Sequence, residues 1–192
     1  MRKKVSLLLI IFGIGFLAYG GYGIWNSKQA EQETLKEAKV AITEKRLTGY
    51  DIASAEEFKP TFGEAVGILS LPDIDAELPI VEGTDEDDLA KGVGHYSTSA
   101  YPGEKDQIVL SGHRDTVFRR LGDLEIGDII TIELPYGKFD YKIESTDIVE
   151  ADDRTVIRPT APDEILTVTT CYPFNFVGNA PQRYIIYAVP VS

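Results

Sequence analysis

Hydrophobic and polar positions divide the chain into an uncharged N-terminal run, a charged segment and a long region of short alternating runs. The uncharged run, residues 5–25, has 21 residues and would rise about 31 Å as a helix, close to the thickness of a bilayer core. Basic residues at positions 2–4 precede it, and such residues tend to stay in the cytoplasm. We therefore expect a single-pass cell-membrane protein with residues 1–4 inside, a transmembrane anchor at 5–25 and the rest outside (N-in, C-out).

A cleaved signal peptide is the alternative interpretation of this run. Ala18-Tyr19-Gly20 resembles a cleavage site with small residues at its first and third positions. The apolar run continues past that site to Trp25, however. This continuation favours a retained anchor, with Trp25 at the outer interface of the membrane.

The segment after the anchor, residues 26–60, predicts a helical stalk and linker. Residues 27–47 are rich in Ala, Glu, Lys, Leu and Gln, which are good helix formers. The apolar positions are too few for a wide stripe, so we expect the stalk to be solvated: Leu35, Ala38, Ala41 and Ile42. Residues 48–61 lack periodicity and end in Lys59-Pro60, which places the start of the folded domain, residues 61–192, near this point.

Beyond residue 60, short runs rich in β-branched residues are separated by Gly, Pro and Asp, a pattern typical of strands. In one run Ile130, Ile132 and Leu134 alternate with polar residues, as in a half-buried strand. Pro135-Tyr136-Gly137 then predicts a hairpin. Seven or eight strands with few helices indicate an all-β barrel or sandwich, and we favour a closed barrel. The predicted strands are 65–71, 76–81, 107–111, 128–134, 138–149, 165–171 and 183–191.

One short helix is predicted at residues 84–91. Thr84 can cap it, and the acidic residues of the first turn suit the helix dipole. The acidic run Asp85-Glu86-Asp87-Asp88 also invites assignment as a calcium site. Consecutive side chains on a helix point in different directions, so we interpret the run as a solvated helix start.

Charge and residue counts exclude several classes of function. The chain has 31 acidic and 19 basic residues and a formal charge of −12, which argues against binding to nucleic acid because phosphate recognition needs a basic surface. It has one cysteine and two histidines. These counts exclude an intrachain disulfide and a multi-cysteine zinc site.

Two residues at strand-to-loop junctions are candidates for chemistry. Cys171 ends a predicted strand, and reactive groups are often displayed at such junctions; a buried structural cysteine is the alternative. His113 follows the predicted strand 107–111, and an imidazole near a thiol can activate it or protonate a leaving amine. The alternative for His113 is a polar surface residue.

Arg183 is a third candidate, at the start of the last predicted strand. A permanent cation at this position could hold a developing oxyanion. The alternative is an arginine at a strand end that points into water.

The order of these three residues, together with the residues before Cys171, resembles the sortase family. The family signature T-L-x-T-C matches at Thr167, Thr170 and Cys171, with Val168 in place of the usual Leu. Other blocks that look like the family's extend from about residue 64 to the end of the chain: Gly92-Val93-Gly94-His95-Tyr96, Pro102-Gly103-Glu104, Leu110-Ser111-Gly112-His113-Arg114-Asp115-Thr116 and Ala180-Pro181-Gln182-Arg183-Tyr184.

The resemblance implies a cysteine transpeptidase of the Gram-positive cell surface with the family's closed eight-stranded β-barrel and one or two short helices. Cys171 would attack the Thr carbonyl of an LPxT-type sorting signal to form a thioester. His113 would protonate the departing amine and deprotonate the incoming one, and Arg183 would stabilise the oxyanion. The implied partners are sorting-signal proteins, a peptidoglycan precursor amine and the membrane, and no metal or cofactor is required.

The resemblance also suggests where the sorting signal binds. Thr170, beside the thiol, is the best substrate-binding candidate, and an inward-facing strand residue is the alternative. The loop at residues 150–163 would form part of the groove, stiffened by Arg158-Pro159 and Ala161-Pro162. His95 lies in a matching block but has no catalytic role to inherit, so we interpret it as structural.

Within the family, the chain looks most like the class D sortases. Residues 49–62 contain no Asp-Pro pair, and the chain ends in Val189-Pro190-Val191-Ser192; together these disfavour a pilus-polymerising sortase, which usually carries an Asp-Pro-aromatic lid and a hydrophobic tail. A surface hydrolase, in which water resolves the thioester, is a second alternative. A non-enzymatic wall-associated binding domain on the same barrel is a third.

Overall fold

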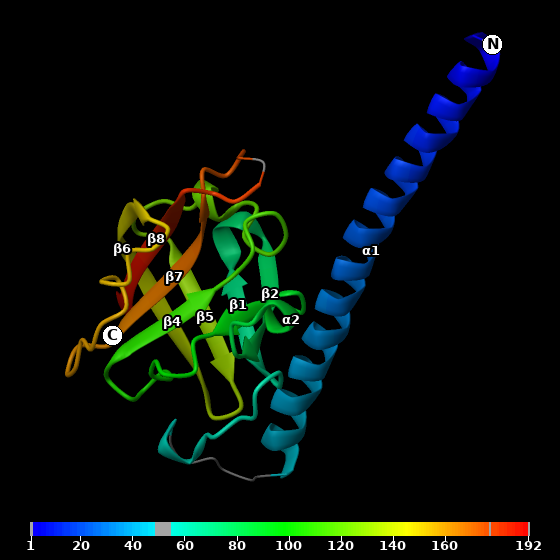
Figure 1. Cartoon of the computed structure of the whole chain (residues 1–192). Coiled ribbons are helices and arrows are strands. Elements are labelled where there is room, and N and C mark those ends of the chain that lie inside the picture. The colour runs from blue at the N-terminus through cyan, green and yellow to red at the C-terminus, as the bar shows by residue number, and fades with distance from the viewer. Residues whose placement is uncertain (1, 49–54, 177, 192) are drawn as a thin grey trace.

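A closed β-barrel of eight strands lies beside one long helix (Figure 1). The computed structural model describes residues 2–48, 55–176 and 178–191, so residues 49–54 of the expected linker lie outside the described residues. The barrel order is β1-β2-β3-β4-β7-β8-β6-β5. The helices and strands are α1 (Arg2–Thr48), β1 (Ala65–Leu71), β2 (Ala76–Glu82), α2 (Glu86–Leu89), β3 (Val93–His95), β4 (Gln107–Ser111), β5 (Ile129–Leu134), β6 (Gly137–Glu150), β7 (Ile165–Tyr172) and β8 (Gln182–Pro190), with short 3-10 turns at Ala55–Glu57, Pro72–Ile74 and Leu121–Asp123.

The alternation of apolar residues builds the barrel core, as the sequence predicts. Ile130, Ile132 and Leu134 are each at most 2% exposed, and Tyr141 on the neighbouring strand is fully buried. β5 ends at Leu134 and β6 begins at Gly137, so the predicted hairpin is present. The prediction of a closed barrel in preference to a sandwich is confirmed.

The strand that the sequence pattern did not predict is β3. It has three residues, pairs in parallel with β2 and pairs antiparallel with β4. A Cβ added at Gly94 would collide with the carbonyl oxygen of Gly83, so glycine permits the close backbone approach here. A three-residue strand that needs glycine shows no alternation, which is why its pattern could not be recognised.

The short helix α2 is only partly as predicted. It covers Glu86–Leu89, fewer residues than the expected 84–91. Asp85, not Thr84, occupies the N-cap position, and its side chain makes no capping hydrogen bond. Asp88 is buried on the inner side of the helix and lies 3.9 Å from the ammonium group of Lys91. One acidic side chain of this run therefore turns inward, whereas Glu86 and Asp87 remain exposed.

The expectation of a solvated stalk is wrong for one face of the helix. α1 runs without interruption from Arg2 to Thr48. Ala38 is completely buried and Ile42 is 4% exposed, because both pack against Ile68 of β1, with Leu35 alongside. Residues 35, 38 and 42 share one helix face, and this narrow stripe is sufficient because it meets an apolar patch on the outside of the barrel.

A buried polar cluster joins β2, β3 and the segment that follows β3. His95 Nδ1 lies 2.7 Å from the Glu82 carboxylate, and His95 Nε2 lies 3.0 Å from the carbonyl oxygen of Ala100. The Tyr101 hydroxyl also donates to Glu82, and its ring stacks on His95. Both imidazole nitrogens face acceptors, and His95 is only 1% exposed. Its partners give His95 a structural role, in agreement with its interpretation from the sequence.

We expect Glu82→Gln to lower the free energy of unfolding by about 1.5–3 kcal/mol at pH 7, the scale of hydrogen bonds to a charged group, because His95 and Tyr101 lose a carboxylate partner. Burial alone would raise the pKa of Glu82, but hydrogen bonds from His95 and Tyr101 lower it below its ordinary value. The stabilisation is therefore present above the unfolded-state pKa of about 4.3 and is lost as the pH falls through the lower folded-state pKa. Urea unfolding of the detergent-solubilised chain between pH 3 and pH 7 measures both effects. An unchanged acid limb in Glu82→Gln would contradict this account.

Candidate active site

The parallel pairing of β4 with β7 brings His113 and Cys171 together. Ser111 pairs with Thr169 in this ladder. His113 and Cys171 each lie two residues beyond that pair, one on each chain segment. Neighbouring strands are about 4.8 Å apart, so the two residues emerge side by side at the same end of the barrel.

The antiparallel pairing of β7 with β8 adds Arg183. Cys171 and Arg183 are direct cross-strand partners, and such partners project from the same face of a sheet. The guanidinium group of Arg183 donates to the carbonyl oxygens of Gln182 at 3.0 Å and Ala180 at 3.3 Å. Both bonds use the same terminal nitrogen of Arg183, and no other hydrogen bond joins its guanidinium group to the residues that the structure describes.

One cavity of about 300 Å³ is lined by all three predicted catalytic residues. The Cys171 thiol is half-buried and His113 is exposed, so the thiol and imidazole are both open to a ligand. Residues from the loops after β4 and β7 line the rest of the cavity: Arg114, Asp115, Gly178, Asn179 and Ala180. A thiol, an imidazole and a guanidinium around one open cavity can carry out acyl transfer through a covalent thioester.

Thr170, the expected substrate-binding residue, points into the barrel. Thr170 is only 2% exposed, and its hydroxyl donates to the carbonyl oxygen of Gly112 at 2.7 Å. Gly112 directly precedes His113. The position of the hydroxyl corresponds to the inward-facing alternative, and it links the strand of Cys171 to the loop of His113.

Arg114 is a site residue that the sequence interpretation missed. It is only 5% exposed. Its guanidinium donates to the carbonyl oxygen of Pro173 at 2.9 Å and to the carboxylate of Asp115 at 3.1 Å. Arg114 therefore ties the loop after β4 to the loop after β7. The adjacent Arg-Asp pair after His113 was visible in the sequence, but nothing in the pattern indicated that this arginine is buried.

The loop between β6 and β7, expected to form part of the substrate groove, runs along the length of the barrel. Near the active-site end, Ala151 donates its backbone N–H to the carbonyl oxygen of Pro181. Farther on, the loop is tied to the start of β4, because Gln107 donates to the carbonyl oxygen of Val156 at 2.7 Å and accepts from the N–H of Arg158 at 2.8 Å. Only the first residues of this loop therefore lie near Cys171.

No group of three or more His, Cys, Asp or Glu side chains among the described residues converges closely enough to hold a metal ion.

The sequence and the fold both match known proteins. Residues 69–191 match the family model of the sortase domain. The chain is 50% identical to sortase D of Bacillus subtilis (strain 168) over the full length of both proteins. It is 24% identical to sortase A of Bacillus anthracis, over 95% of this chain and 90% of that protein.

A solved structure of a sortase D5 transpeptidase from Clostridium perfringens superimposes with a TM-score of 0.71 at 26% identity, covering 85% of this chain and 99% of that one. The match includes the barrel and agrees with the eight-stranded fold described above. From the family model, the full-length relative and the barrel together, we conclude that this chain belongs to the sortase family of cysteine transpeptidases and is a class D member of it.

Proposed function

We propose that this protein is a membrane-anchored transpeptidase that cleaves an LPxT-type sorting signal after its Thr and transfers the protein to a peptidoglycan amine. The observation that carries the proposal is the convergence of Cys171, His113 and Arg183 on one open cavity of a sortase barrel. Family membership argues against the alternative of a non-enzymatic binding domain.

In the proposed first step, the thiolate of Cys171 attacks the carbonyl carbon of the signal's Thr. The carbonyl oxygen becomes an oxyanion, which the guanidinium group of Arg183, the cross-strand partner of Cys171, would stabilise. Collapse of the tetrahedral intermediate breaks the peptide bond and leaves a thioester. The departing nitrogen takes a proton from His113, the exposed imidazole of the cavity.

In the proposed second step, an amine attacks the thioester and restores the thiolate of Cys171. His113 accepts the proton that this amine loses, so each catalytic group returns to its starting state. Thr170 contributes indirectly in this scheme, because its hydroxyl holds Gly112 next to His113. We therefore revise its role from substrate contact to positioning, since its hydroxyl is buried and already donates to Gly112.

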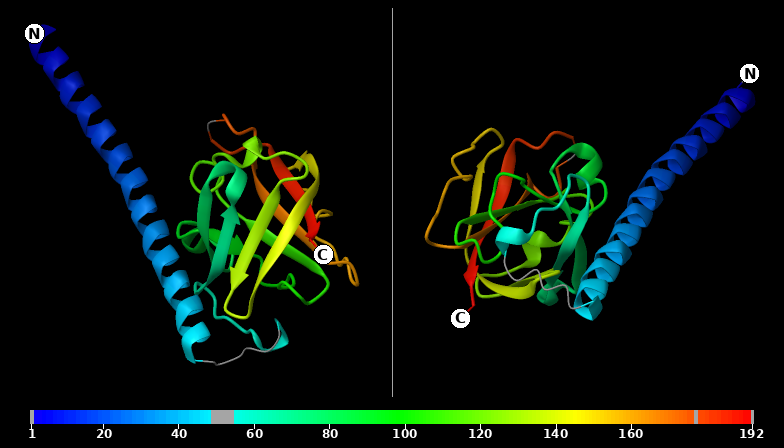
Figure 2. Two further views of the ribbon diagram at one scale, coloured as in Figure 1. Left: turned by 180° about the vertical axis from the view of Figure 1, so that it is seen from behind. Right: turned by 90° about the horizontal axis from the view of Figure 1, so that it is seen from below.

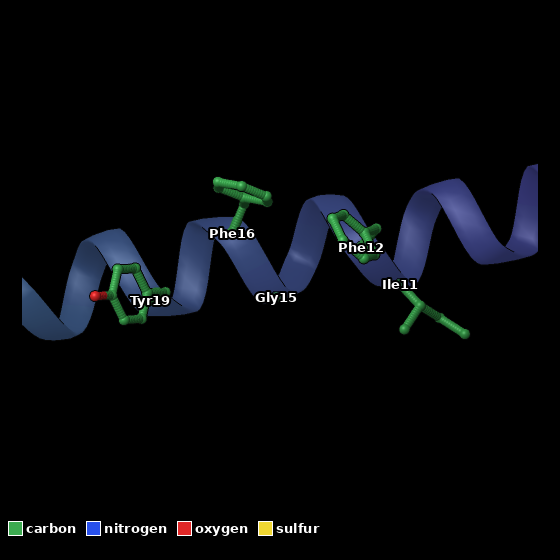
Figure 3. A pocket seen from close by; sticks show the side chains of 5 residues that line it. All are labelled: Ile11, Phe12, Gly15, Phe16 and Tyr19. Carbon is green, nitrogen blue, oxygen red and sulfur yellow. The ribbon is translucent and has the colours of Figure 1, made fainter.

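The proposed location is the cell membrane, with residues 1–4 inside, 5–25 spanning, 26–60 as stalk and linker, and the barrel of 61–192 outside. Among the described residues, one helix is long and apolar enough to cross a membrane, and none of its most apolar stretch is buried. Ile11, Phe12 and Phe16 project from this part of α1 into open surroundings (Figure 3). The basic residues before the span support the N-in, C-out orientation.

Mass spectrometry of peptide products tests the proposed reaction. The full chain in detergent is incubated with LPxT-containing peptides that vary at the second and fourth positions, with and without an amine acceptor. We expect cleavage after Thr and, when the amine is present, a product whose mass includes the acceptor. Cleavage without incorporation at saturating amine would instead identify the surface hydrolase, and no cleavage of any peptide would contradict both.

A further inference from the structure

The stalk part of α1 docks on the barrel through a small but closed apolar contact. Ala38 and Ile42 are buried against Ile68, with Leu35 and Ala65 at the edges of the contact. Val40, on the other side of the helix, is 54% exposed. One face of the helix is therefore packed against the barrel, and this contact prevents free rotation of the helix about its axis.

An ion pair defines the direction of the docked helix. Lys39 Nζ lies 2.6 Å from the carboxylate of Glu77 on β2, and Glu77 pairs with Ser70 of β1. Ile42, one helical turn later, packs against Ile68, which comes earlier in β1. The direction from Ile42 back to Lys39 is therefore the direction in which β1 runs, so the N-terminus of α1 points the same way as the end of β1.

Strand pairing shows that this direction leads to the active site. Antiparallel steps connect β1 to β5, β5 to β6, β6 to β8 and β8 to β7. An even number of reversals leaves β1 and β7 running the same way, and β7 ends with Cys171 and Tyr172. Arg120, in the segment after His113, donates to the carbonyl oxygen of Ile74 just beyond β1 at 2.8 Å. The N-terminal part of α1 and the active site therefore lie toward the same end of the molecule, as Figures 1 and 2 show.

The exposed apolar part of α1 begins a short distance beyond the docking contact. Trp25 is 58% exposed and precedes Lys39 by 14 residues. At the rise of an α-helix this separation is about 21 Å. A bilayer around residues 5–25 would thus begin close to the level of the active-site end of the barrel.

Two arginines and an exposed aromatic ring lie at this end of the barrel. The chain carries a net charge of −12, yet Arg119 and Arg183 form no ion pair with any described residue and donate only to backbone carbonyl oxygens. A cavity of about 370 Å³ next to the catalytic cavity combines Arg119 with Phe176, which is 42% exposed. Asp115 also lines this cavity, and its carboxylate pairs with Arg114. Cationic and aromatic side chains together are typical of surfaces that contact the membrane interface.

We propose that the active-site end of the barrel faces the outer surface of the membrane that holds α1, with the rim around Arg119 and Phe176 in contact with lipid headgroups. The inference rests on the membrane anchoring proposed above but not on the chemistry of Cys171. Because the stalk is docked on the barrel, it holds the cavity near the bilayer. A substrate that is itself held in the membrane can then reach Cys171 without a rotation of the barrel relative to the membrane.

Energy transfer to labelled lipids tests this orientation in the full chain. Cys171→Ser removes the one cysteine of the chain. Into this variant a single new cysteine is introduced to carry a donor dye. It is Thr116→Cys on the rim or Lys138→Cys at the β5–β6 hairpin. Both positions are exposed. The proteins are placed in liposomes that contain anionic lipid and acceptor-labelled headgroups in the outer leaflet. Flotation of the liposomes reports anchoring separately.

We expect transfer from position 116 to exceed transfer from position 138 by at least about twofold, because β7 alone, which has eight residues, spans about 26 Å between the two ends of the barrel. Ala38→Glu, which places a charge in the docking contact, should remove the difference. Val40→Glu is the matched control on the exposed face of the same helix and should preserve it. Equal or reversed transfer in protein that floats would overturn the orientation and leave anchoring intact. Protein that does not float would overturn both.

Discussion

Replacing Cys171 by Ala should abolish cleavage of sorting-signal peptides and should leave the barrel folded. We expect the rate to fall by at least about 10⁴-fold, the scale of losing a covalent nucleophile. The thiol is half-buried at the end of β7 and lines the open cavity, so its removal deletes the attacking atom and creates little internal space. Initial rates of peptide cleavage, together with thermal unfolding of both proteins, measure the two effects.

The covalent intermediate provides a second and independent readout. Wild-type protein mixed with peptide in the absence of amine should gain the mass of the N-terminal fragment, and Cys171→Ala should not. Thiol labelling by a methanethiosulfonate reagent should modify the folded wild-type protein, because the Cys171 residue is partly exposed. Cleavage at the wild-type rate by Cys171→Ala, or a folded protein whose thiol resists labelling, would remove Cys171 from the nucleophile role.

Replacing His113 by Ala should lower kcat by about 10²–10⁴-fold, the range for losing a general acid–base group. The effect on stability should stay within about 0.5 kcal/mol, as for most surface substitutions, because His113 is exposed. Pre-steady-state rates of thioester formation and of its aminolysis distinguish the two proton transfers that we assign to this residue.

His95 is the matched control for His113. It is 1% exposed and joins Glu82 and Ala100 through its two ring nitrogens. His95→Gln should therefore lower the midpoint of thermal unfolding but leave kcat per folded molecule close to the wild-type value. If His113→Ala retains the wild-type kcat per folded molecule, the exposed histidine has no catalytic part.

Local pattern was sufficient to predict most of the barrel. Strand β5 shows why, because the side chains of Ile130, Ile132 and Leu134 face the core and polar residues alternate with them. That alternation is a direct consequence of the two-residue repeat of a strand. Strand β3 has only three residues and depends on Gly94 to approach Gly83. Its existence follows from neighbouring strands and has no pattern of its own.

The apolar pattern of the stalk did not reveal the face that docks on the barrel. The uncharged run at residues 5–25 predicts a membrane span by its length alone. Burial of Ala38 and Ile42, by contrast, depends on the outer face of β1, where Ile68 provides the complementary surface. A narrow apolar stripe on a helix is ambiguous until the surface that meets it is known.

The order of residues along the chain was sufficient to recognise the family. The motif that ends in Cys171, with His113 and Arg183 in order around it, resembles the sortases, and this resemblance predicts acyl transfer through a thioester. Which of these groups lie close together depends on the fold. Parallel pairing of β4 with β7 brings His113 beside Cys171, and the buried Arg114 joins their loops at Pro173. The reactivity of a side chain depends on its residue type, which is visible in the sequence. The proximity of distant segments depends on strand register and direction, which many weak long-range contacts determine together.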